Sequence, residues 1–254
     1  TIVKGYEWTT SNGHANVYGN IPSVVPNTET ASNMLSTHRA QGALVSINHP
    51  MSTQGLGPIT TCNGCVWKWG WIGTDAIEIW NWDWTISSSS KAFQWWRDLL
   101  SVGNKITGVN GADFHTWPQA LNDPYIMVYA DNNTQAGILD GIKKGHVSMI
   151  KEGDTSKLWL EADTGCDNSY EAMMGDEITV NYGQKVCFKV YVTGTSTYDD
   201  VEVYSKYGKV IDHKVGGSPY TFNFGIIATE NNFYVAFIEP VSYTHLRAHE
   251  TGRN

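Results

Sequence analysis

The chain has 254 residues and a net charge of −8, and 41% of its residues are hydrophobic while 17% are charged. This length allows a sizeable core and a second, smaller domain, and the composition is typical of a globular protein. The acidic balance disfavours a nucleic-acid partner, and no apolar run approaches the roughly 18–20 residues that a membrane span requires.

The first part of the sequence alternates strand-like and helix-like segments. Apolar residues at helical spacing predict helices over residues 28–41, 88–102 and 134–144, with Thr134 capping the third. Short apolar runs predict strands at 43–47, 76–80, 106–109, 125–129 and 146–150. This alternation favours an α/β domain over residues 1–152, with a mostly parallel sheet or barrel.

After Lys151 the pattern changes to short alternating runs separated by turn residues. No helical periodicity is visible there, so we expect an all-β sandwich domain over residues 153–240. Tyr207-Gly208 reads as a hairpin turn. The expected strands cover 157–162, 177–181, 185–192, 201–204, 210–215, 220–224 and 232–238.

Both ends of the sequence look unnatural. The chain starts with Thr1, not Met, inside a strand-like run, so we expect a missing N-terminal segment. Residues 241–254 follow a finished strand without periodicity and resemble translated sequencing adapter. We therefore exclude this tail from the expected fold, including His245 and His249.

The cysteines leave several interpretations open. Cys62 and Cys65 form a Cys-Asn-Gly-Cys loop without zinc-finger or thioredoxin context, which fits a local disulfide, free thiols or, less well, a structural zinc. The states of Cys166 and Cys187 do not follow from the sequence. A composition rich in Trp, Asn and Thr with few charges leans toward an extracellular protein, without deciding it.

Five potential metal ligands lie at the ends of strand-like segments. Asp113 and His115 form an Asp-x-His pair just after an apolar run, and Glu7, His14 and His49 occupy similar settings upstream. Because loops at the carboxyl ends of parallel strands converge on one face, these side chains can form one site. Imidazoles and carboxylates suit zinc, manganese or iron, which make hydroxide available as a nucleophile near neutral pH.

Each of these residues also has an ordinary structural explanation. Asp often caps a loop, a His before Pro is commonly a loop residue, and a lone Glu can belong to an ion pair. The occurrence of four such motifs at strand ends is what favours a metal site with Asp113 and His115 as the catalytic residues. We assign the remaining histidines of the two domains, His38, His146 and His213, to structural roles.

Tryptophans cluster beside these motifs and predict either core packing or a wall for substrate. Trp82, Trp84 and Trp117 lie in loops and are the predicted substrate contacts, whereas Trp80 lies in a strand and favours the core. The other members of the cluster are Trp67, Trp69 and Trp71. An alternative function is therefore a secreted carbohydrate-binding module whose tryptophans hold sugar and whose histidines are incidental.

The order and context of the motifs resemble the polymerase and histidinol phosphatase (PHP) superfamily, and within it the carbaryl-hydrolase-like branch. The similarity covers residues 1–240. It rests on Gly-Tyr-Glu-Trp-Thr-Thr around Glu7, Asn-Gly-His-Ala-Asn-Val-Tyr-Gly around His14, Ile-Asn-His-Pro around His49, Ile-Glu-Ile-Trp-Asn at 77–81 and Gly-Ala-Asp-Phe-His at 111–115.

This resemblance implies a distorted (β/α)7 barrel followed by a β-sandwich. It also implies two or three divalent metal ions and hydrolysis of a small-molecule phosphoester or, in this branch, of a carbamate or amide. By resemblance, the metal ligands are Glu7, His14, His49, Asp113 and His115. Family members begin with a His-x-His strand and a Thr-Asp-His segment that this sequence lacks, so we expect N-terminal truncation and an incomplete ligand set.

Overall fold

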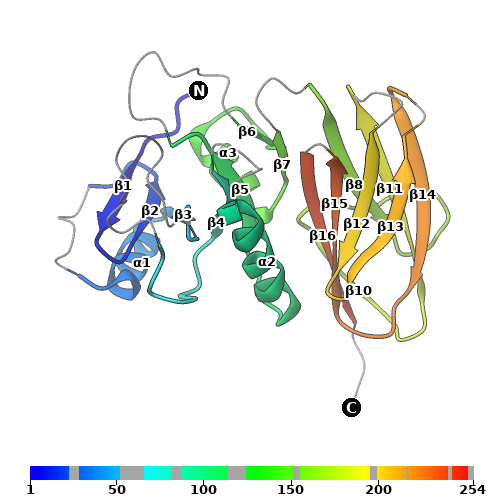
Figure 1. Cartoon of the computed structure of the whole chain (residues 1–254), viewed down its shortest axis with the longest axis horizontal. Coiled ribbons are helices and arrows are strands. Elements are labelled where there is room, and N and C mark those ends of the chain that lie inside the picture. Colours follow the sequence, from blue (N-terminus) through cyan, green and yellow to red (C-terminus); the bar gives the residue numbers. More distant parts are fainter. Residues whose placement is uncertain are drawn as a thin grey trace. The chain divides into compact units, whose positions relative to one another are not determined.

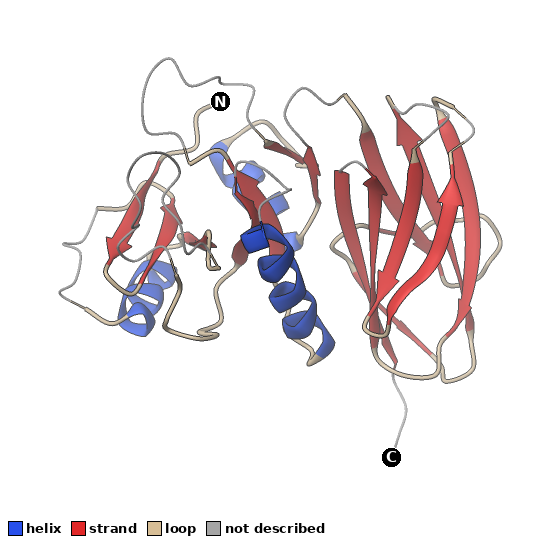
Figure 2. Ribbon diagram, in the orientation of Figure 1, coloured by secondary structure: helices blue, strands red, loops and turns tan. Residues whose placement is uncertain are grey.

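The computed structural model describes residues 1–22, 29–51, 66–81, 87–113, 124–150, 155–194, 199–215, 217–239 and 242–250 (Figures 1 and 2). The chain forms two compact units, and each unit contains several separate segments of the sequence. Unit 1 contains Thr1–Leu99, Asn104–Gln119 and Tyr129–Lys143, and unit 2 contains Leu100–Gly103, Ala120–Val128 and Lys144–Asn254.

Unit 1 has a five-stranded sheet with the order β1-β2-β3-β4-β5. Strands β1 to β3 pair antiparallel, whereas β3, β4 and β5 run parallel. The bounds are β1 (Gly5–Thr10), β2 (Gly13–Tyr18), β3 (Leu44–Asn48), β4 (Ala76–Asn81) and β5 (Thr107–Gly111). The fold is thus mixed α/β.

The distorted (β/α)7 barrel that the resemblance implies, incomplete at its N-terminus, is not confirmed by the described residues. Their sheet is open, with β1 at one edge and β5 at the other. The antiparallel part has a simple cause: a two-residue connection joins β1 to β2, and so short a connection cannot cross over to a parallel strand.

The expected helices form close to their predicted positions. The first is α1 (Ala31–Ala40), where Thr30 caps the start by accepting from Asn33 N. The others are α2 (Ser87–Ser101) and α3 (Gln135–Lys144). Thr134 caps α3 by accepting from Gly137 N at 3.1 Å, as the sequence predicts. None of the described helices is long and apolar enough to cross a membrane.

Unit 2 consists of two sheets. One has the order β13-β12-β15-β16-β7-β6, with β10 also paired to β16, and the other has the order β14-β11-β8-β9. Strands of the first are β6 (Tyr125–Val128), β7 (Val147–Ile150), β10 (Glu177–Val180), β12 (Asp200–Ser205), β13 (Gly208–Lys214), β15 (Asn232–Glu239) and β16 (Ser242–Glu250). Strands of the second are β8 (Lys157–Asp163), β9 (Ala172–Met173), β11 (Lys185–Thr193) and β14 (Tyr220–Ile227).

Two features of unit 2 differ from the sequence-based expectation. Strands β6 and β7, which fall inside the expected first domain, pair with each other and join the larger sheet of unit 2 through β16. The tail that we excluded from the fold supplies β16, which pairs antiparallel with β15 and parallel with β10. Tyr243, Leu246 and Ala248 are separated by polar residues, so the strand has no clear apolar alternation.

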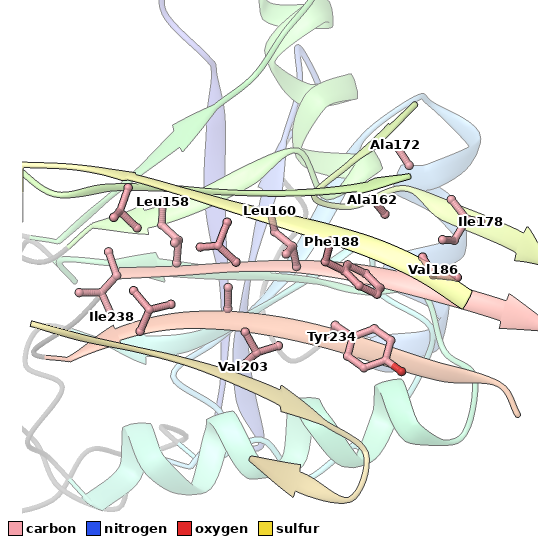
Figure 3. Packing of buried hydrophobic residues seen from close by; sticks show 14 of the residues in the cluster. Leu158, Leu160, Ala162, Ala172, Ile178, Val186, Phe188, Val203, Tyr234 and Ile238 are labelled. Atoms are coloured by element: carbon pink, nitrogen blue, oxygen red, sulfur yellow. The ribbon is translucent and has the colours of Figure 1, made fainter. Parts of the chain in front are cut away.

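A hydrophobic cluster fills the space between the two sheets of unit 2 (Figure 3). Alternate residues of β11 are buried, including Phe188 at 0% exposure, and they meet Val203 of β12 and Tyr234 of β15 in this cluster. Strict alternation of this kind is what a half-buried strand requires. A disulfide between Cys166 and Cys187 joins the loop after β8 to β11.

Candidate metal centre

Three adjacent strands of unit 1 bring Glu7, His14 and His49 together. Glu7 lies within β1, His14 near the start of β2, and His49 directly after β3. His14 is the cross-strand partner of Thr9 in β1 and of Asn48 in β3. This register places His14 diagonally opposite Glu7 and next to His49. Antiparallel pairing, and not the mouth of a parallel barrel, therefore gathers these side chains.

The three side chains form a compact cluster of potential ligands. Their ligand atoms all lie within 4.8 Å of one another. His14 Nδ1 is 3.4 Å from Glu7 Oε1, and His49 Nε2 is 3.6 Å from the same oxygen. The two imidazole rings meet edge to face, with 5.0 Å between their centroids. Both histidines are buried, whereas the Glu7 side chain is 35% exposed.

Hydrogen bonds and nearby imidazoles keep Glu7 ionised. Partial burial works to raise the pKa of Glu7, but contacts from His14, His49 and Asn48 outweigh it and hold the pKa well below its usual range. Asn48 Nδ2 donates to Glu7 Oε1 at 2.9 Å, and Thr9 Oγ1 donates to Oε2 at 3.3 Å. The site therefore contains a deprotonated carboxylate, which is the form that binds a cation.

The spacing of the donor atoms fits a divalent metal ion. Two ligand atoms about 2.1 Å from a tetrahedral ion lie roughly 3.4 Å apart. The separations of 3.4 and 3.6 Å match that value and are long for direct hydrogen bonds. His14 Nε2 is also buried without a hydrogen-bond partner in the described part of the chain. Two nitrogens and one carboxylate oxygen form a donor set suited to zinc, manganese or iron.

A buried carboxylate, Glu78 on β4, lies next to this cluster. Its Oε2 accepts from the backbone N of His49 at 2.5 Å and from Asn81 Nδ2 at 3.4 Å. Burial raises the pKa of Glu78 to about 7, and the negative charge of Asp113 adds to this increase, while His49 opposes it. His49, Glu78 and Asn81 also line a small pocket together with Ser89 of α2.

Backbone conformations near the cluster are unusual. His49 has φ of 27° and Asp113 has φ of 48°, both in the left-handed region that residues with a side chain seldom adopt. Strained residues of this kind concentrate at functional sites. Gly111 approaches Glu78 so closely that a Cβ there would overlap Glu78 Oε1. The ends of β3 and β5 thus meet at one carboxylate of β4.

The sequence-based site is only partly described by the structure. Glu7, His14 and His49 lie together, and Asp113 is close enough to Glu78 to influence its pKa. The other predicted site residues, namely His115, Trp82, Trp84 and Trp117, lie outside the described residues, as do Cys62 and Cys65. Their roles stay predictions.

Sequence reasoning assigned no role to Glu78 or Asn48. A single Glu in the apolar run 76–80 gives no signal beyond a strand, although an acidic residue in such a run is itself uncommon. Trp67 and Trp80 are buried at 7% and 1% exposure, so these two tryptophans give no support to a carbohydrate-binding surface. His38 is buried on α1, and its Nε2 contacts the Tyr6 hydroxyl.

Comparisons with known proteins give remote likenesses. No family profile and no curated protein matches the chain. A two-domain protein from Bacteroides vulgatus, described as containing a predicted PHP-like metal-dependent phosphoesterase, is 15% identical with a TM-score of 0.43, covering 96% of this chain and 74% of that one. A CARDB domain from Pyrococcus furiosus is 13% identical with a TM-score of 0.25, covering 38% of this chain and 97% of that one. Similarity this low does not by itself assign an activity.

Proposed function

We propose that the chain is part of a metal-dependent hydrolase of the PHP type that acts on a small-molecule phosphoester. One observation carries the proposal: an ionised carboxylate and two buried imidazoles converge at the distances expected around a divalent cation. The order of motifs that resembles the PHP superfamily supports the same assignment. A bound zinc, manganese or iron ion would supply Lewis-acid chemistry and lower the pKa of water.

The residues of the site would have separate roles. Glu7, His14 and His49 would hold the cation, with Asn48 and Thr9 fixing the orientation of the Glu7 carboxylate through hydrogen bonds. Asp113 and His115, which follow β5 in the sequence, would add further ligands and supply the remaining catalytic groups. The tryptophans Trp82, Trp84 and Trp117 would contact the organic part of the substrate.

Hydrolysis of an aryl phosphate tests this function. The chain is assayed with zinc, manganese or iron added, beside the variants His49→Ala and Asp113→Ala. Each variant should abolish the metal-dependent rate, because each removes a donor from the same centre. His213→Ala is the matched control, since it removes an imidazole from the sandwich of unit 2 and should leave the rate unchanged. Full activity in His49→Ala would refute the site.

A further inference from the structure

In the smaller sheet of unit 2, β14 is a long edge strand without charged residues. Strand β14 spans eight residues and pairs only with β11 among the described strands. Its sequence, Tyr-Thr-Phe-Asn-Phe-Gly-Ile-Ile, has no Asp, Glu, Lys or Arg and no Pro. Such an edge presents a row of backbone donors and acceptors to any chain that can add a strand.

The other edges of the same sandwich are protected. Strand β13 carries Lys209, Asp212 and Lys214, and its pairing with β12 contains a register irregularity. Strand β9 has only two residues, and β6 and β10, which also lie at open edges of the larger sheet, have only four residues each. Charges, bulges and short length are the usual means by which edge strands avoid pairing with other chains. Strand β14 uses none of them.

The inward face of β14 is also incompletely covered. The even-numbered residues of β14 face the core cluster but are only partly buried, in contrast to the buried side chains of β11, and they are Tyr220, Phe222, Phe224 and Ile226. Near the end of the strand, Ile226 and Ile227 line an apolar cavity with Val210. Ile227 is 53% exposed and Val210 is 41% exposed. Apolar surface therefore remains to be buried along this edge.

From these observations we infer that β14 is a self-association edge, at which a second copy of this chain adds its own β14 antiparallel and joins the two small sheets into one. A second copy fits this edge because β14 itself carries no ionised group, and Lys189, the β11 neighbour of the central Asn223, is paired with Glu161. Because both copies would pair through the same strand, the contact is isologous, and it closes as a two-fold dimer and does not propagate.

The side-chain pattern fixes the register of this pairing. Antiparallel partners must point to the same face, so even-numbered residues oppose even-numbered ones. A two-fold axis at Asn223 satisfies this rule and sets Phe222 of one copy opposite Phe224 of the other. It also sets Tyr220 of one copy opposite Ile226 of the other, beside the apolar cavity. Aromatic cross-strand pairs of this kind stabilise antiparallel sheets.

The charge of Lys185 on β11 does not prevent this pairing. Its side chain lies across Gly225 on the outer face of the sheet. In the pairing centred on Asn223, Gly225 faces Thr221 of the second copy, which carries no charge. The two Lys185 side chains are then separated by several residues along the joined strands, and neither lies directly opposite the other.

Analytical ultracentrifugation of the whole chain tests the inference. We expect a species of twice the 28.2-kDa monomer mass that dissociates on dilution. Asn223→Lys, which sets two lysines opposite each other at the axis, should weaken dimerisation on the order of tenfold or more. Thr179→Lys, at an exposed residue of the four-residue strand β10, is the matched control and should leave it unchanged. A purely monomeric chain, a larger oligomer or an unaffected Asn223→Lys dimer would overturn the inference.

A cross-linking variant keeps the test decisive if Asn223→Lys fails to fold. Asn223→Cys brings two thiols together at the two-fold axis, so mild oxidation should give a covalent dimer that the unsubstituted chain does not give under the same conditions. The chain already contains Cys62, Cys65 and the Cys166–Cys187 disulfide, and the unsubstituted chain controls for them. Failure of the Asn223→Cys thiols to cross-link would contradict the proposed register.

Discussion

The backbone N–H of His49 donates to Glu78 Oε2 at 2.5 Å, which ties the end of β3 to the middle of β4. The bond links a potential metal ligand to a carboxylate that is buried at 8% exposure. His49 has a left-handed φ of 27°, so its conformation depends on the contacts around it. Glu78 is therefore placed to orient His49.

Removal of the Glu78 carboxylate should weaken metal binding. In Glu78→Ala the buried N–H of His49 loses its acceptor, which costs about 1–3 kcal/mol, and the imidazole loses its fixed position. Loss of such a supporting contact typically lowers metal affinity about 10–100-fold. Titration calorimetry with zinc or manganese measures the change. Glu78→Gln retains an acceptor oxygen and should bind more tightly than Glu78→Ala; equal affinities would argue against the positioning role.

A side chain at position 111 should disturb the same carboxylate. Gly111→Ala would bring a Cβ into Glu78 Oε1, and because that side chain is buried it cannot move into solvent. We expect a loss of about 1–3 kcal/mol in the free energy of unfolding, measured with a chemical denaturant. Gly165→Ala is the control, because a Cβ there meets its neighbours at ordinary distances of 3.5 Å or more. Similar stabilities of the two variants would contradict the close approach.

Phe188 should be among the most important residues for the stability of unit 2. Its ring is 0% exposed and stacks on Phe224 with 5.0 Å between centroids, while Tyr234 lies 4.9 Å away. Phe188→Ala removes this ring from the centre of the cluster and should cost about 3–5 kcal/mol of unfolding free energy. Tyr191→Ala, on the outer face of the same strand, is the comparison, and we expect it to cost less. A loss below 1 kcal/mol for Phe188→Ala would mean that the ring is not packed as described.

The disulfide of unit 2 should contribute measurably to stability. Cys166 and Cys187 are 21 residues apart, and a closed loop of this length restricts the unfolded chain enough to stabilise the fold by about 3 kcal/mol. The double variant Cys166→Ser/Cys187→Ser should therefore unfold at a lower denaturant concentration than the unsubstituted chain. A reducing agent should shift the unsubstituted chain in the same direction and should shift the double variant less. If neither treatment has an effect, the bridge does not constrain the fold.

The sequence predicted local structure better than it predicted how the segments assemble. Helix α3 and its cap at Thr134 follow from local signals, namely periodicity and an N-cap residue. The hydrophobic alternation of β11 likewise identifies a sandwich strand. Strand β16 could not be recognised, because it is defined by its pairing with β15 and β10 and not by its own pattern.

The same distinction applies to the site. Glu7, His14 and His49 could be proposed as a group, because each residue type suits a metal and each belongs to a strand-like segment. Their actual convergence depends on the register of β1, β2 and β3, which the sequence does not specify. Glu78 was missed for a related reason, since its importance lies in one hydrogen bond to a residue 29 positions away.

We propose that Glu7, His14 and His49 together hold a divalent cation. The most direct test is an anomalous difference map from crystals of the chain soaked in zinc or manganese. We predict a peak about 2.0–2.3 Å from one Glu7 carboxylate oxygen and from one nitrogen of each histidine, and no peak there in His14→Ala crystals treated in the same way. A map without density at this position, from crystals in which the three side chains are ordered, would contradict the account.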